Sequence, residues 1–170
     1  WRLLKALWHC WRRAPRSLGY RLRLVRNLGH ACRLAASLPA AKQLRLHAQF
    51  AWSAADAAAL AATALELEWS CSVHAWDVFT RPPRETRARL ASTVAITACT
   101  ERAAAAVRRA GVTPTKVRVI RHGLDPALFS PTASRRPQQI VAVGRLVPKK
   151  GFDLLLRACA ELQRRAIPFT

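Results

Sequence analysis

Short strand-like segments alternate with helical segments along most of this chain, and this alternation constrains the fold more than any other feature. The predicted strands are residues 43–47, 70–74, 93–97, 116–120 and 139–143, and residues 167–170 begin another. Helical patterns cover residues 53–67, 100–110 and 151–165. Ser53 and Thr100 are the predicted N-caps of the first two helices, and Gly111 is the predicted stop of the second. This order is typical of an α/β protein with a parallel sheet. Because the strands read as apolar runs, we expect a doubly wound sheet covered on both faces.

The region before the first strand is strongly basic. Residues 1–37 read as helical, with breaks near Pro15 and at residues 37–39. Residues 1–55 hold 11 basic and no acidic residues, in a chain with 29 basic residues, 9 acidic residues and a net charge of +20. If residues 1–13 are helical, one face collects the following apolar side chains: Leu3, Leu4, Leu7, Trp8 and Trp11. Such a face either lies on an anionic membrane surface or packs on the protein core.

Composition narrows the class of protein. Apolar residues make up 51% of the chain, which excludes global disorder. The charge favours a polyanionic partner, namely nucleic acid, an anionic membrane or a phosphorylated substrate. Nucleic acid is the minor alternative, because no nucleic-acid-binding motif is present. Five cysteines without a C-x-x-C pair or zinc spacing indicate reduced, structural thiols in a cytosolic compartment.

Ligands of parallel α/β sheets bind beyond the carboxyl ends of the strands, and one such segment here is rich in cations. In residues 144–151 (GRLVPKKG), Gly144 follows a predicted strand, and Arg145 and Lys150 precede a predicted helix. A helix N-terminus with two cations suits a phosphate or diphosphate. The alternative is a solvated basic loop. The segment matches neither the Walker pattern nor G-x-G-x-x-G.

Histidines end or follow three of the other predicted strands. His47 and His74 end the predicted strands 43–47 and 70–74, and Asp77 lies three residues beyond His74. His122 follows the predicted strand 116–120. A histidine at a strand end acts as a general acid or base, hydrogen-bonds a substrate, or is a satisfied structural residue. The sequence leaves these alternatives open.

Together these segments resemble the family-four glycosyltransferases, which have the two-domain GT-B fold. The matching pieces, in the family's order, are residues 46–50 (LHAQF), 72–78 (SVHAWDV), 94–101 (VAITACTE), 119–131 (VIRHGLDPALFSP) and 140–155 (IVAVGRLVPKKGFDLL). The resemblance covers about residues 43–170 and is closest to bacterial enzymes of exopolysaccharide or lipopolysaccharide assembly, such as those of colanic acid synthesis. It implies parts of two Rossmann-like domains.

The resemblance also implies roles for individual residues. Arg145 and Lys150 would grip the diphosphate of a UDP- or GDP-sugar donor and stabilise the leaving nucleotide, and Gly144 would let the backbone approach it. His74 would hydrogen-bond a donor hydroxyl near the reacting carbon. The substrate-binding set would be completed by His47, Asp77 and Gly123. The configuration at the sugar would be retained, with no cofactor besides the donor and no metal, since the cations replace it.

The same resemblance predicts the organisation of the whole chain. Residues 1–130 would be the later part of the acceptor domain, 131–138 the interdomain linker and 139–170 the start of the donor domain. The family's Glu-x7-Glu motif is absent, so we expect a fragment that binds donor weakly and does not turn over. The function would be sugar transfer to a glycan or lipid-linked acceptor in cell-surface polysaccharide synthesis. The location would be cytoplasmic, peripheral to the inner face of the plasma membrane; the alternative is a basic membrane-surface or nucleic-acid-binding module without catalysis.

Overall fold

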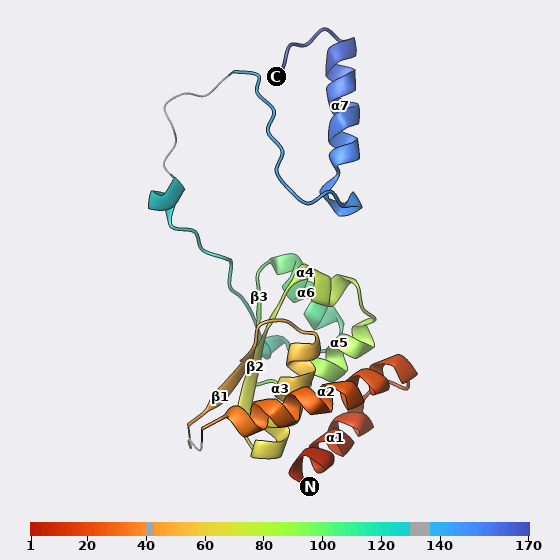
Figure 1. The fold of residues 1–170 in the computed structure, drawn as a ribbon, viewed down its shortest axis with the longest axis vertical. Helices are drawn as coiled ribbons and strands as arrows, with labels where there is room; N and C mark the ends of the chain where they lie inside the picture. Colours follow the sequence, from red (N-terminus) through yellow and green to blue (C-terminus); the bar gives the residue numbers. More distant parts are fainter. Residues whose placement is uncertain (40–42, 130–136) are drawn as a thin grey trace. The chain divides into compact units, whose positions relative to one another are not determined.

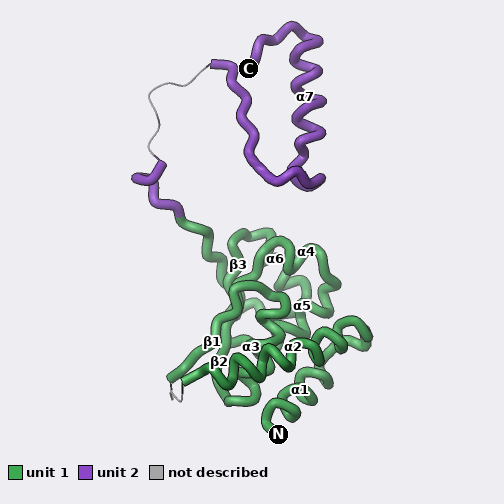
Figure 2. Tube along the Cα trace, viewed as in Figure 1, with its two compact units in different colours: residues 1–123 green, residues 124–170 purple. Residues whose placement is uncertain are grey.

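A four-stranded, all-parallel sheet organises the first part of the chain (Figure 1). The computed structural model describes residues 1–39, 43–129 and 137–170. The strands follow sequence order across the sheet: β1 (Arg45–Ala48), β2 (Glu68–Val73), β3 (Ala95–Ala98) and β4 (Val117–Val119). This architecture confirms the prediction of an α/β protein with a parallel, Rossmann-like sheet. The chain divides into two compact units, residues 1–123 and 124–170 (Figure 2).

The helices between the strands cover one face of the sheet. They are α3 (Ser53–Leu65), α4 (Ala75–Phe79), α5 (Pro83–Leu90) and α6 (Glu101–Arg109). Consecutive parallel strands joined by right-handed crossovers place their connecting helices on the same side. Leu46, Trp69 and Ile96 are accordingly buried toward those helices. The other face differs from the expected apolar runs, because its residues, such as His47 and Arg118, are polar and lie at alternate strand positions.

Helix α3 is the centre of the core. It is rich in alanine, and most of its side chains are buried, including Ala55, Leu60 and Ala61, all fully inaccessible. Small side chains permit close approach by neighbours on several sides. In residues 1–123, α1 (Arg2–Arg13) and α2 (Leu18–Ser37) form an outer layer against α3 (Figure 1).

Helix α1 divides its apolar side chains between the core and solvent. Leu3, Ala6, Leu7 and Cys10 pack on the core, as the packing alternative predicted. The large apolar side chains of this region that stay exposed are Trp1, Leu4 and Trp8. The described residues include no helix long and apolar enough to cross a membrane.

Some helix boundaries follow the predicted signals, whereas others do not. Thr100 caps α6, accepting a hydrogen bond from the Ala103 N–H at 3.1 Å, and Gly111 follows the helix with φ of +87°. Both were predicted. Ser53, the predicted cap of α3, is instead its first residue, and Trp52 occupies the cap position without a side-chain hydrogen bond. Helices α4 and α5 were not predicted, because both are too short for a clear helical period.

The second unit contains helix α7 (Phe152–Arg164), preceded by the 3-10 turns η2 (Pro126–Phe129) and η3 (Pro148–Lys150). Residues 139–143 do not form the predicted buried strand and are exposed. Within the described residues, their ladder is limited to the Ile140 N–H, which donates to the Thr170 carbonyl, and the Thr170 N–H, which donates to the Gln138 carbonyl. Two hydrogen bonds do not make the continuous row of bonds that joins paired strands, so residues 139–143 are not a strand among the described residues. The domain boundaries stay predictions, and residues 131–136 of the predicted linker lie outside the described residues.

Candidate functional site

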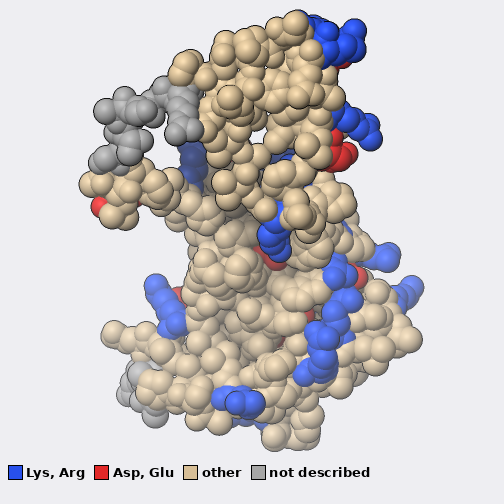
Figure 3. All heavy atoms as spheres, turned by 45° about the horizontal axis from the view of Figure 1, so that its top comes forward, with Lys and Arg blue, Asp and Glu red and all other residues tan. Residues whose placement is uncertain are grey.

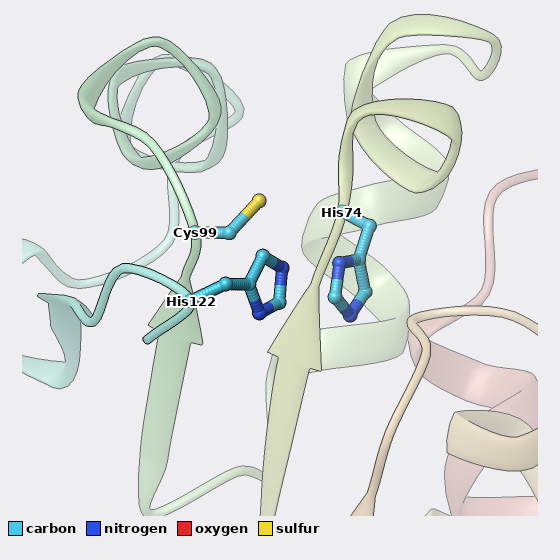
Figure 4. A group of neighbouring side chains, drawn as sticks. All are labelled: His74, Cys99 and His122. Atoms are coloured by element: carbon cyan, nitrogen blue, oxygen red, sulfur yellow. The ribbon is translucent and has the colours of Figure 1, made fainter. Parts of the chain in front are cut away.

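Three neighbouring strands deliver His74, Cys99 and His122 to one edge of the sheet (Figure 4). His74 directly follows β2, and Cys99 directly follows β3. His122 lies just beyond β4, where the Ile120 N–H still donates to the Ala98 carbonyl at 2.9 Å. Because carboxyl ends of parallel strands share one edge, residues far apart in sequence meet here.

The side chains of His74, Cys99 and His122 lie close together, and no hydrogen bond joins them within the described part of the chain. The rings of His74 and His122 stack with centroids 5.5 Å apart and an interplanar angle of 4°. Phe50 lies beside His74 as well, with ring centroids 4.8 Å apart. One potential ligand atom from each of His74, Cys99 and His122 lies within 4.8 Å of the others. The Nε2 atom of His74 is buried and has no hydrogen-bond partner among the described residues.

Asp77 holds the backbone that carries His74. Its side chain is buried, and its Oδ2 accepts hydrogen bonds from the His74 N–H at 2.9 Å and the Ala51 N–H at 3.2 Å. The carboxylate therefore ties the turn after β2 to the loop after β1. This is a positioning role; the predicted contact of Asp77 with substrate stays a prediction.

His47 is placed on the polar face of the sheet. Its Nδ1 lies 2.8 Å from Ser70 Oγ and its Nε2 lies 2.9 Å from Ser72 Oγ. Ser72 Oγ continues this row to Thr97 Oγ1 at 2.8 Å. Both ring nitrogens of His47 are thus engaged by side chains of β2, and the predicted role in substrate binding stays a prediction.

In the second unit, the predicted cationic segment precedes α7. Lys150 ends η3, and Gly151, with φ of +67°, is the residue from which α7 starts. The Lys150 side chain passes Gly144, since a Cβ built on Gly144 would lie 3.7 Å from Lys150 Cδ. Arg145 and Lys150 are both exposed. Exposed cations near a helix N-terminus are suited to a phosphate, and the predicted role of Arg145 and Lys150 at a diphosphate stays a prediction.

The segment after β4 holds the remaining predicted site residue. Gly123 is exposed, and a Cβ added to it would meet no atom within 4 Å. Nearby, Asp125 Oδ1 accepts a hydrogen bond from the Ala127 N–H at 2.9 Å, which starts η2. No steric need for glycine exists at residue 123 among the described residues, so its predicted role rests on the resemblance.

Cys99 is the residue of this cluster that was not among the predicted site residues. A signal was available, because Cys99 lies two residues beyond the predicted strand 93–97, just as His122 lies two residues beyond 116–120. The short ligand spacings typical of zinc sites do not include Cys99, because it lies 25 positions after His74 and 23 positions before His122. Only the order of the strands in the sheet brings them together.

Comparisons with known proteins give partial similarities to two glycosyltransferases. A protein of Escherichia coli K12 named as a colanic acid biosynthesis glycosyltransferase, WcaL, is 33% identical over 66 residues, which cover 37% of this chain and 16% of that protein. A phosphatidylinositol N-acetylglucosaminyltransferase subunit of Arabidopsis thaliana is 44% identical over 62 residues, 34% of this chain and 14% of the relative. No family model and no solved structure matches. The similarity supports a general glycosyltransferase relationship over about a third of the chain.

Proposed function

We propose that this chain is part of a retaining glycosyltransferase that takes a sugar from a UDP- or GDP-sugar and transfers it to a glycan or lipid-linked acceptor of cell-surface polysaccharide. The observation that carries the proposal is the placing of Lys150 and Gly151 directly before α7, with Arg145 in the same segment. The partial similarity to two glycosyltransferases supports it. The matched segments span about a sixth or less of those relatives, so the activity of the whole protein is included in the proposal.

In the proposed chemistry, the two cations act on the leaving group. Arg145 and Lys150 would stabilise the negative charge that develops on the nucleoside diphosphate when its bond to the sugar breaks. Charge-assisted hydrogen bonds and the N-terminal N–H groups of α7 would contribute in the same direction. His74 would hydrogen-bond a donor hydroxyl, and Asp77 would hold the His74 backbone in place through the contact at 2.9 Å. Beyond the donor, no cofactor or metal is proposed for this step.

The diphosphate site can be tested by NMR titration of the whole chain with UDP, GDP and uridine. We expect UDP and GDP, but not uridine, to shift the amide signals of Gly144, Lys150 and Gly151. The affinity should be weak, with a Kd of about 1 mM, or about −4 kcal/mol. Lys150→Ala should weaken binding by about tenfold, whereas Lys149→Ala, which removes the adjacent cation, should have little effect. Equal losses from both variants would indicate a solvated basic loop.

A second test concerns turnover. We expect the chain of 170 residues to give no transfer from UDP- or GDP-sugars to glycan or lipid-linked acceptors, because it lacks the Glu-x7-Glu segment that the resemblance places at the donor. Release of nucleoside diphosphate is the measurement. Turnover that disappears in Arg145→Ala would contradict the expected inactivity while supporting the proposed role of the cations.

A membrane-surface function is the second proposal, and the exposed side of α1 favours it. Trp1, Leu4 and Trp8 are 84%, 56% and 62% exposed, and they share the helix region with Arg2 and Lys5. Exposed tryptophans with cations on one helix suit an anionic lipid surface. The proposed location is the inner face of the plasma membrane, where such contact would bring the chain near a lipid-linked acceptor.

Flotation with vesicles tests this contact. We expect the chain to bind vesicles that contain phosphatidylglycerol and not those of phosphatidylcholine alone. Trp8→Ala should weaken binding several-fold. Trp76→Ala is the matched control, because Trp76 is 61% exposed but lies on α4. If Trp76→Ala is equally damaging, or if neutral vesicles bind as well, α1 is not the binding surface.

Nucleic acid is the weaker alternative for the basic surface. In the face drawn in Figure 3, Lys and Arg side chains lie in several groups that other residues separate. A nucleic-acid surface instead needs a continuous basic track, with aromatic side chains for stacking in the case of single strands. Binding to mixed DNA that falls steeply with salt would support this alternative over the membrane.

A further inference from the structure

We propose that His74, Cys99 and His122 form a Zn²⁺ site with one coordination position open. The three side chains converge beyond the ends of adjacent strands (Figure 4). Imidazole nitrogen and thiolate sulfur are ligands that zinc prefers, and three protein ligands leave a fourth position for water or another small ligand. The inference rests on residues 1–123 alone and does not depend on the proposed transferase function.

The fold supplies the ligands from three different strands. His74 is fixed by the Asp77 carboxylate, which accepts its backbone N–H at 2.9 Å. Cys99 directly follows β3 and precedes Thr100, the cap of α6. The backbone of His74 is thus fixed at the start of α4, and the backbone of Cys99 lies between β3 and α6. His122 is exposed and lies beyond the last strand, so its ring has the most freedom to adjust.

The spacing of the ligand atoms is near that of a zinc site. Bond lengths of about 2.0–2.3 Å in a tetrahedron require ligand atoms about 3.3–3.8 Å apart. The atoms here lie within 4.8 Å of one another. The difference is about 1 Å. The His74 and His122 rings are parallel, so the exposed His122 ring would also have to turn about its side-chain torsions for both rings to bind one ion.

Two observations distinguish this cluster from an ordinary packing arrangement. The first is that His74 Nε2 is buried without a hydrogen-bond partner among the described residues, although buried polar atoms in proteins are usually paired. The second is that the cluster itself contains no acidic side chain among the described residues, so two imidazoles and a thiol are the groups that an ion would meet there. In Figure 4 the other nitrogen of the His74 ring, Nδ1, is turned toward Cys99 and His122, so the proposed ion would bind Nδ1 and leave Nε2 for a water molecule or another ligand.

Binding would follow simple proton chemistry. Each neutral imidazole donates one nitrogen lone pair, the Cys99 thiol releases its proton to the buffer, and the thiolate binds the ion. No redox step occurs, because Zn²⁺ has no accessible second oxidation state. Zinc would engage the same His74 ring that the transferase proposal places near a donor sugar, so the two occupancies would compete.

Titration of the reduced full chain with Zn²⁺ and with Co²⁺ tests the site. We expect one ion per chain by calorimetry, and for Co²⁺ a visible spectrum of tetrahedral type with a thiolate-to-metal charge-transfer band. Cys99→Ser should remove that band. Cys99→Ser, His74→Ala and His122→Ala should each weaken Zn²⁺ binding by at least about tenfold, in line with the sensitivity of metal sites to their ligands.

Matched controls separate this site from adventitious binding. Cys32→Ser and His30→Ala remove an exposed thiol and an exposed imidazole from α2, and both should leave Zn²⁺ binding unchanged. Circular dichroism checks that each variant is folded, and His122→Ala is the safest ligand variant because His122 is exposed. If no ion binds, if Cys99→Ser keeps the charge-transfer band, or if the controls lower affinity as much as the ligand variants, the proposal is wrong.

Discussion

Asp56 and Arg89 form an ion pair in the interior of residues 1–123. Arg89 Nε lies 2.7 Å from Asp56 Oδ1, and the two side chains are 2% and 1% exposed for Asp56 and Arg89 respectively. Asn27 Nδ2 donates to Asp56 Oδ2 at 3.0 Å, and Arg89 also donates to the Ala51 carbonyl. Burial by itself lowers the pKa of Arg89, but the charge and hydrogen bonds of Asp56 raise it above its usual value. The pair thus joins α3 to α5 while α2 contributes Asn27.

Breaking this pair should be strongly destabilising. Asp56→Ala leaves a buried guanidinium without its partner, and we expect the free energy of unfolding to fall by about 3–5 kcal/mol. Urea denaturation followed by circular dichroism is the measurement. Arg45→Ala is the matched control, since Arg45 and Glu68 form an exposed pair at 3.0 Å and should contribute about 1 kcal/mol or less. Similar losses in both variants would contradict the role given to burial.

Replacing either of two glycines with alanine should change the stability of the fold, in opposite directions for the two positions. Gly111 has φ of +87°, and an added Cβ would lie 3.3 Å from Arg87 Cδ, so Gly111→Ala should cost about 1–2 kcal/mol of stability. Gly29 lies inside α2, with no atom within 4 Å of an added Cβ. Gly29→Ala should therefore raise stability by about 0.5–1 kcal/mol. Thermal unfolding of both variants checks the signs, and the prediction fails if they agree.

Asp77 should be needed for the loops at the strand ends. Asp77→Ala would leave the N–H groups of Ala51 and His74 without their acceptor, at a cost of about 1–3 kcal/mol for each group that stays buried. Asp77→Asn keeps an oxygen acceptor in place and should cost less. Amide hydrogen exchange at residues 51 and 74 is the direct readout. Unchanged protection in Asp77→Ala would show that other groups hold these loops.

The cysteines should differ in reactivity because burial changes their thiol pKa. Burial, with a smaller effect of Asp77, raises the pKa of Cys71 to about 12, and burial with the charge of Asp56 raises that of Cys10 to about 11. At pH 8 both thiols stay protonated. Iodoacetamide should therefore modify the exposed Cys32 at least about a hundredfold faster than Cys71, as followed by peptide mass spectrometry. Equal rates in the folded protein would contradict this; urea provides the unfolded control.

The same shifts predict a pH dependence of stability. Thiols of the unfolded chain ionise near pH 8.5, whereas Cys10 and Cys71 keep their protons in the folded chain until about pH 11–12. Above about pH 8.5 the unfolded state thus binds fewer protons, and the free energy of unfolding decreases as pH rises. Denaturation at pH 7.5 and 10 measures this decrease, and replacing Cys71 with Ala should reduce it.

The prediction of the site depended on where local sequence signals were strong. His74 and Asp77 could be found because they follow a clear strand, and the structure brings the Asp77 carboxylate back to the His74 N–H. His47 was grouped with them by the same argument, yet its ring lies on the polar face of the sheet between Ser70 and Ser72. Whether a side chain at a strand end faces the edge or the sheet depends on one residue of register, which local patterns do not fix.

The sequence by itself determined the parallel α/β class, the ends of α6 and the cationic segment before α7. These features depend on periodicity, on the Thr100 cap and on Gly111, which act within a few residues of the chain. Only the tertiary structure decided that His74, Cys99 and His122 meet and that the helices between the strands leave one sheet face polar. Both follow from strand order and crossover direction, and these depend on packing between segments that are distant in sequence.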